Sequence, residues 1–213
     1  MKETAHYQAN GFNKLFDEAQ FPLLALALQT SAVRKTFRAG DTIVFQNEAI
    51  DRLGYLTEGE AEIEILSVDG EMLIAEKFVS GSLLNAVSFL DGKTSPATVV
   101  AVSECTVLFL AYSKLRSEAN LEHEAKLLSG LCAAALYRMS EQLLSTSLLM
   151  PLKQRVLLRL QSLKQLDDEV LITAEKLAAY LAVSKHRVHR VLKELEKDSK
   201  IINTYGAVKL LDS

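Results

Sequence analysis

The stretch that decides the fold is TAEKLAAYLAVSKHRVHRVLKELEK, residues 173–197. Thr173 and Ser184 each stand where a side-chain oxygen can cap the start of a helix. They predict one helix to about Leu181 and a second to about Lys197. Only Ala182 and one further residue separate the first helix from the second cap, so the helices meet at a tight turn. This arrangement is typical of a helix-turn-helix.

The second of these helices has two chemically different faces. Helical spacing places four apolar side chains on one stripe and basic or donor-rich side chains opposite it. Phosphates attract such charges, and Arg and Lys can donate to guanine O6 and N7. We therefore expect this face to contact DNA, with Arg190 and Lys185 as the first choices for base contacts. The candidate DNA-binding residues are Ser184, Lys185, His186, Arg187, His189, Arg190 and Lys193.

Two features of this stretch have alternative interpretations. His186 and His189 are three residues apart and could chelate a metal, but the neighbouring cations would repel it and no carboxylate or cysteine is nearby in sequence. We predict no metal site there. Ala182 stands at a turn position where glycine is usual. If its φ is positive, alanine costs about 1 kcal/mol.

Proline and turn residues mark the limits of the C-terminal domain. Pro151 disfavours a helical residue before it and can open a helix from Leu152 to Leu163. A terminal hairpin, residues 201–211 with a turn at 203–206, follows the helix-turn-helix as a wing. We therefore predict a winged helix-turn-helix domain over residues 151–213.

The residues from about 33 to 112 read as short strands separated by turn signals. Residues 61–65 alternate so that Ala61, Ile63 and Ile65 share one face, and Asp69-Gly70 is a hairpin turn. Many short strands at this spacing predict an all-β roll. We expect a sensor domain over residues 1–112 with an N-terminal helical segment, and an α+β chain overall.

A long helix is predicted from about Ser113 to Leu149, since no proline interrupts it. It carries one apolar seam that steps 4-3-4-3-4, the spacing of a two-stranded coiled coil. A second stripe, Leu127, Leu131 and Ala134, could pack back on the roll. We predict a homodimer through residues 113–150, with an interface made by Leu121, Ala125, Leu128, Cys132, Ala135 and Met139.

Charge and composition agree with a chain in which one end meets nucleic acid. Residues 1–150 carry 12 Lys+Arg against 19 Asp+Glu, and residues 151–213 carry 12 against 8, so an acidic body precedes a basic domain. No long uncharged apolar stretch and no signal peptide are evident, and two cysteines are too few for a disulfide framework. We expect a cytoplasmic protein.

The order of roll, long helix, hinge proline and winged helix-turn-helix resembles the Crp/Fnr family of bacterial regulators. The winged segment is the most specific part, and Gly40-Asp41, Tyr55 and Gly59 in the roll also match family positions. The resemblance implies a transcription factor, not an enzyme, that binds palindromic DNA as a homodimer and contacts RNA polymerase.

The effector pocket departs from the family pattern. Members that bind cyclic AMP carry Gly-x-x-x-Gly-Glu-Leu and then Arg-Ser-Ala, where this chain has residues 81–87 and 95–97. Ala86 replaces the glutamate for the ribose, and Ser95 replaces the arginine for the cyclic phosphate. A desolvated phosphate without a cation would cost several kcal/mol. The degenerate pocket comprises Gly81, Leu83, Leu84, Asn85, Ala86, Ser95 and Thr98.

The identity of the effector therefore stays open. Either the pocket has collapsed into core, which we favour, or it accepts an uncharged or weakly polar ligand. An iron–sulfur cluster needs about four thiolates, and haem would have only His123 as a histidine ligand near the roll. We predict no cofactor, with a regulator dependent on a small ligand or haem as the alternative. An enzyme of cupin type is disfavoured because residues 33–112 contain no histidine.

Overall fold

The computed structural model describes residues 15–69, 71–164 and 168–211. The chain divides into two compact units. The first holds the described residues up to 71 together with 75–139, and the second holds 72–74 and 140–211. Each unit has its own hydrophobic core, and each is described by itself below.

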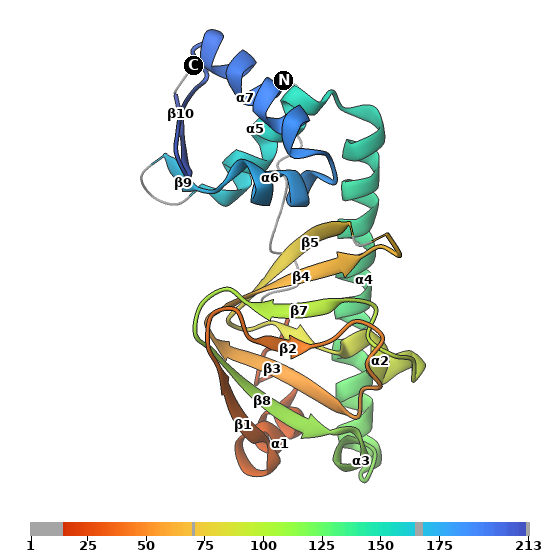
Figure 1. Cartoon of the computed structure of the whole chain (residues 1–213). Coiled ribbons are helices and arrows are strands. Elements are labelled where there is room, and N and C mark those ends of the chain that lie inside the picture. The colour runs from red at the N-terminus through yellow and green to blue at the C-terminus, as the bar shows by residue number, and fades with distance from the viewer. Residues whose placement is uncertain (1–14, 70, 165–167, 212–213) are drawn as a thin grey trace. The chain divides into compact units, whose positions relative to one another are not determined.

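The first unit is built on a roll of two four-stranded antiparallel sheets (Figure 1). One sheet has the order β1 (Val33–Phe37), β8 (Cys105–Ala111), β3 (Arg52–Glu58), β6 (Leu83–Leu84). The other has the order β2 (Thr42–Val44), β7 (Thr98–Ala101), β4 (Glu60–Leu66), β5 (Met72–Val79). The helices are α1 (Pro22–Ser31), α2 (Ala86–Asp91), α3 (Tyr112–Leu115) and α4 (Ala119–Leu149). The predicted all-β roll and α+β class are confirmed.

Strand β8 is buried on both faces, and this gives the first unit two layers of core. Val107 and Phe109 point between the sheets and join the cluster inside the roll. Leu110, on the opposite face, joins a cluster formed with α1 and α4. The alternation of a strand thus ties the roll to the helices that cover it.

The predicted alternation in residues 61–65 holds for only part of β4. Ala61 and Ile63 are buried, as expected, but Ile65 is exposed. The pairing of β4 with β7 runs from Ala61 to Glu64 and does not reach Ile65. Ile65 therefore lies on the protruding end of the β4–β5 hairpin, where no β7 residue stands beside it. The predicted turn itself includes Gly70, which lies outside the described residues.

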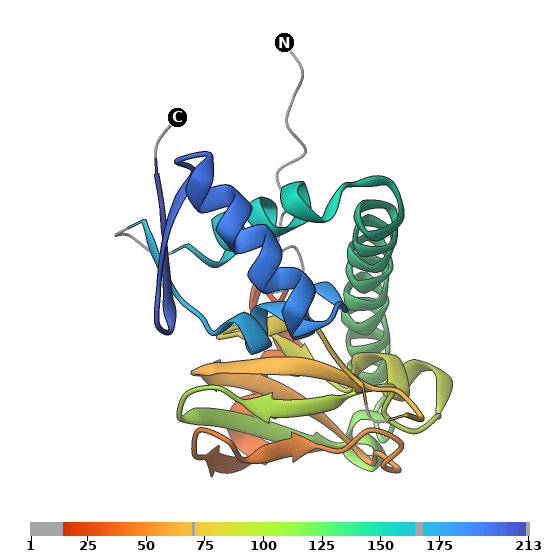
Figure 2. The same ribbon diagram turned by 45° about the horizontal axis from the view of Figure 1, so that its top comes forward.

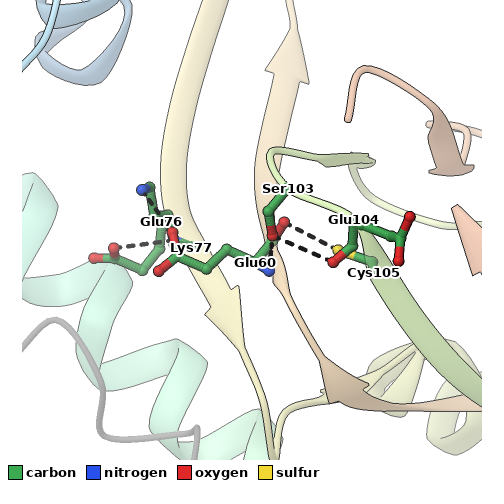
Figure 3. A network of polar contacts seen from close by, with 6 residues as sticks. All are labelled: Glu60, Glu76, Lys77, Ser103, Glu104 and Cys105. Atoms are coloured by element: carbon green, nitrogen blue, oxygen red, sulfur yellow. Dashed lines mark hydrogen bonds and ion pairs between the residues drawn. The ribbon is translucent and has the colours of Figure 1, made fainter. Parts of the chain in front are cut away.

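A polar corner fixes the start of β4 (Figure 3). The N–H of Glu60 donates to Ser103 Oγ at 2.9 Å, and Cys105 Sγ donates to the carbonyl of Glu60 at 3.1 Å. On the neighbouring strand, Lys77 Nζ pairs with the Glu60 carboxylate at 3.0 Å. Gly59, with φ +89°, makes the turn into this corner. Burial raises the pKa of the Cys105 thiol, which belongs to the core inside the roll.

Helix α4 begins later than predicted. The apolar stripe that packs against the chain's own core is also not the stripe that was predicted to do so. A turn at residues 116–118 separates α3 from α4. The predicted dimer seam is wrong: its members pack within the chain's own core, four in the cluster beneath α1 and two against the roll interior. These residues are Leu121, Ala125, Leu128, Cys132, Ala135 and Met139.

The stripe that was expected to cover the roll is the exposed one. Leu127, Leu131 and Ala134 face outward on α4. Both stripes are apolar at helical spacing, so the sequence pattern could not say which of them the roll covers. Cys132, buried to 3% exposure, has its thiol pKa raised to about 12 by burial. We therefore do not expect Cys132 to cross-link two copies on oxidation.

The second unit is a compact winged domain. It contains α5 (Leu152–Leu163), β9 (Glu169–Leu171), α6 (Ala174–Leu181), α7 (Lys185–Lys197), β10 (Ile201–Thr204) and β11 (Ala207–Leu210). The strands form one antiparallel sheet in the order β10-β11-β9. Gly206, with φ +81°, closes the β10–β11 turn. The helices and the terminal hairpin follow the predicted ranges closely, because caps and apolar spacing define them locally.

Among the described residues, no helix combines the length and the apolar character that crossing a membrane requires.

Candidate nucleic-acid interface

A tight turn joins α6 to α7. Thr173 caps α6 as predicted, since its Oγ1 accepts a hydrogen bond from the N–H of Lys176 at 3.1 Å. Ala182 ends α6 in the left-handed conformation, with φ +50°, and so carries the predicted cost of about 1 kcal/mol. The N–H of Val183 closes the turn on the carbonyl of Ala178. Ser184 has extended backbone angles at the start of α7, but its side chain makes no capping hydrogen bond, contrary to the prediction.

Helix α7, drawn in blue in Figure 2, has one buried and one exposed face, as the sequence predicts. Val188, Val191, Leu192 and Leu195 are buried in the core of the domain. Each of the candidate contact residues is exposed: Ser184, Lys185, His186, Arg187, His189, Arg190 and Lys193. The structure therefore brings all seven to one accessible surface, which we call the α7 face.

Little within the domain competes for the charges of the α7 face. Lys185 Nζ lies 3.5 Å from Glu175 Oε2, and both side chains are more than half exposed. A surface pair of this kind is worth at most about 1 kcal/mol and can yield to a phosphate. Glu196, at the other end of α7, accepts a hydrogen bond from the N–H of Asn203 at 3.1 Å. This bond fixes the hairpin of β10 and β11 beside α7, and the exposed Tyr205 lies at the hairpin turn.

Arg155 braces the turn, a role that the sequence did not indicate. Its guanidinium donates to the carbonyl of Leu181, the last residue of α6, at 2.6 Å and to Ser147 Oγ at 3.3 Å. The last carbonyls of a helix lack partners within the helix. Burial, and then the charge of Arg187, lower the pKa of Arg155. No local pattern marks this arginine, because its partners lie 8 and 26 residues away in the chain.

The degenerate effector cassette lies in the roll, and most of its side chains are core. Leu83, Leu84 and Ala86 are buried in the two clusters of the first unit. Ser95 Oγ donates to the carbonyl of Ala97 at 2.7 Å. Thr98, which is also buried, uses its Oγ1 to accept from the N–H of Gln46 at 3.1 Å.

Two cassette positions are only partly buried. Gly81 and Asn85 have positive φ values, +94° and +65°. Asn85 replaces the second glycine of the cassette and keeps a left-handed conformation, which asparagine tolerates.

The described residues hold no group of three or more His, Cys, Asp or Glu side chains that could bind a metal ion. His186 and His189 are both exposed on α7, and His123 is exposed on α4.

Comparison with known proteins finds a family model and a sequence relative that are similar to this chain. Residues 34–120 match the family model of the cyclic nucleotide-binding domain. The chain is 24% identical over 180 residues to the cAMP-activated global transcriptional regulator Vfr of Pseudomonas aeruginosa. That alignment covers 79% of this chain and 84% of Vfr.

Solved structures share the fold over most of the chain. The c-di-GMP responsive global regulator CLP of Xanthomonas campestris matches with a TM-score of 0.78 at 16% identity, covering 92% of this chain and all of CLP. FixK2 of Bradyrhizobium japonicum matches with a TM-score of 0.67 at 16% identity, covering 85% of this chain and 93% of FixK2. Residues 34–120 are therefore similar to a cyclic nucleotide-binding domain, and the chain shares its fold with these solved structures.

Proposed function

We propose that this protein is a sequence-specific DNA-binding regulator that acts as a homodimer on a palindromic operator. The observation that carries the proposal is the α7 face, on which seven donor or cationic residues are exposed while the opposite side of the helix is buried. A helix of this kind enters the major groove in helix-turn-helix proteins. A two-fold symmetric dimer places two such helices on two half-sites. In line with the family, we also propose RNA polymerase as a partner.

Arg190 and Lys185 are the residues that we assign to base contacts. Both are exposed, and Arg190 makes no ion pair with a described residue. Arg190 is therefore available for a bidentate contact with guanine. His186 cannot accept a hydrogen bond from cytosine N4 as a carboxylate would, so the preferred half-site should differ from that of relatives with glutamate there.

Arg190→Ala should weaken specific binding by about 1–3 kcal/mol and relax the preference at one position of each half-site. The operator would first be obtained by selecting genomic fragments bound by the wild-type protein. Fluorescence anisotropy at fixed salt concentration would then compare specific and nonspecific duplexes. The control is Lys93→Ala, which removes one positive charge from the roll surface and should leave both affinities unchanged. Unchanged affinity and selectivity of Arg190→Ala would show that the assignment of Arg190 is wrong.

The dimer that we propose uses the exposed side of α4. Leu127, Gly130, Ala134 and Tyr137 follow one another at steps of 3, 4 and 3 residues, and the same spacing continues in sequence through Glu141 to Leu144 and Leu148. Leu127 is 47% exposed and Tyr137 is 69% exposed. A Cβ atom added at Gly130 would meet nothing within 4 Å. A helix stripe of this size and spacing is typical of a two-stranded helical interface.

We also propose that the protein does not bind a cyclic nucleotide in the usual mode of the family. Ala86 and Ser95 supply neither the carboxylate nor the cation of the cassette, and the Ser95 hydroxyl already donates to a backbone carbonyl. Of the three proteins named above, Vfr is described as activated by cyclic AMP and CLP as responsive to c-di-GMP. The signal of this protein would then be another molecule, or its control would depend on abundance.

Calorimetry should detect no heat of binding when cyclic AMP, cyclic GMP or c-di-GMP is titrated into the purified protein at micromolar concentrations. The physical reason is the cost of desolvating a phosphate that finds no cation, several kcal/mol. Melting temperatures with and without each nucleotide provide an independent measurement. Saturable micromolar binding accompanied by tighter operator binding would contradict the proposal.

A further inference from the structure

A second pocket opens at one end of the roll, outside the region of the family cassette. It encloses about 260 Å³ between β1, β2, the segment 48–52 and Phe109 of β8. Asn85 is its one lining residue among the degenerate effector residues. The pocket is smaller than the roughly 300–1,000 Å³ that drug-sized ligands occupy, so a small metabolite fits it best.

The lining of the pocket is mixed, and two of its aromatic side chains contact each other. Phe37 and Phe109 lie edge to face with ring centroids 6.4 Å apart. Val44 and Phe109 are buried, and Ile43 and Ile50 are partly exposed at the walls. A flat apolar ligand can therefore pack against the Phe37–Phe109 pair. Aromatic rings favour offset or edge-to-face contacts of this kind.

Lys35 supplies the positive charge of the pocket. Lys35 and Phe37 are two residues apart on β1 and so share one face of the strand, on which Lys35 is exposed and Phe37 is half-buried. Lys35 pairs in register with Val107, whose side chain belongs to the interior cluster. The ammonium group of Lys35 forms no ion pair or hydrogen bond with any residue that the structure describes. The pocket lining thus includes an exposed cation without a described partner together with the Phe37–Phe109 pair.

The other charged groups that line the pocket already have partners. The Asp51 carboxylate accepts from Arg52 Nε at 2.6 Å. The Glu48 carboxylate accepts from the N–H of Phe45 at 2.9 Å within the same turn. The paired Asp51–Arg52 charges cancel. The Glu48 carboxylate keeps its negative charge, because a backbone N–H does not neutralise it. Lys35 is the cation of the lining that has no partner among the described residues.

We infer that this pocket binds a small carboxylic acid with an apolar, preferably aromatic, body, whose carboxylate pairs with Lys35. The aromatic part packs against the Phe37–Phe109 pair, and the ligand's size follows from the enclosed volume. Apart from Asn85, the residues that line this pocket lie outside the degenerate effector cassette. The inference goes beyond the proposed function, because it does not depend on DNA binding.

Saturation-transfer NMR with the full-length protein and sodium phenylacetate as the probe tests the inference. Wild-type protein should transfer saturation to the phenyl protons, and the signal should saturate as the probe concentration rises. Lys35→Ala should reduce the signal at least fivefold. The matched control is Arg34→Ala, which removes a cation from the same strand but on its opposite face, and this variant should behave as the wild type.

A second probe tests whether the pocket prefers an anionic or a cationic ligand. Phenethylamine has a similar apolar body but a cationic head, and it should give at least fivefold less signal than phenylacetate. Absence of saturable phenylacetate binding, equal signals from Lys35→Ala and the wild type, or stronger binding of phenethylamine would each overturn the inference. Circular dichroism of Lys35→Ala, expected to match that of the wild type, shows that the variant is folded.

Discussion

Leu127→Asp is expected to convert the dimer into a folded monomer that binds its operator poorly. Leu127 lies on the exposed stripe of α4, so in the proposed dimer the substitution would bury two opposed carboxylates at the two-fold axis. Each protomer would also lose the burial of a leucine, about 1.5–3 kcal/mol. Sedimentation equilibrium gives the oligomeric state, and the melting temperature of the monomer reports that the fold is retained.

Leu128→Asp, one residue further on, should behave in the opposite way. Leu128 is fully buried in the core beneath α1 and α4. An unpaired carboxylate placed there costs several kcal/mol, a large part of the stability of a typical domain. We therefore expect unfolding or aggregation, not a folded monomer. A folded dimer of Leu127→Asp would exclude this stripe as the interface, and a folded monomer of Leu128→Asp would restore the seam first predicted from the sequence.

Gly59→Ala is expected to destabilise the roll by about 2–5 kcal/mol, the sum of a left-handed backbone cost and overpacking. A Cβ atom at Gly59 would lie 2.1 Å from the carbonyl oxygen of Glu104 and 2.9 Å from Cys105 Sγ. Relief of these contacts would have to move the corner of Figure 3, where Glu60 bonds to Ser103 and Cys105. Chemical denaturation of the variant and the wild type measures the difference.

Gly40→Ala is the matched control for the Gly59 substitution. Gly40 has φ +90°, nearly the value at Gly59, but an added Cβ would meet nothing within 4 Å. Only the backbone cost, about 1–2 kcal/mol, should appear there. Equal losses in the two variants would show that the contacts with Glu104 and Cys105 contribute nothing.

The winged domain is the part of the protein that the sequence determined best. Its caps, its turn and the apolar stripe of α7 are set by residues within a few positions of one another. Thr173 caps α6, Ala182 adopts the left-handed conformation expected at a glycine position, and the basic residues of α7 lie on its exposed side. Helical periodicity alone fixes which residues share a face, so the α7 face could be derived without a structure.

Only the tertiary structure decided which apolar stripe of α4 faces outward, what remains of the effector cassette, and where a pocket stays open. Leu127 and Leu128 are adjacent in sequence and equally apolar, yet one is exposed and the other fully buried. Lys35 gains its place in a pocket because β1 pairs with β8, some 70 residues away in the chain. Contacts of this kind depend on how distant segments pack against each other, and local propensity and periodicity hold no information about that packing.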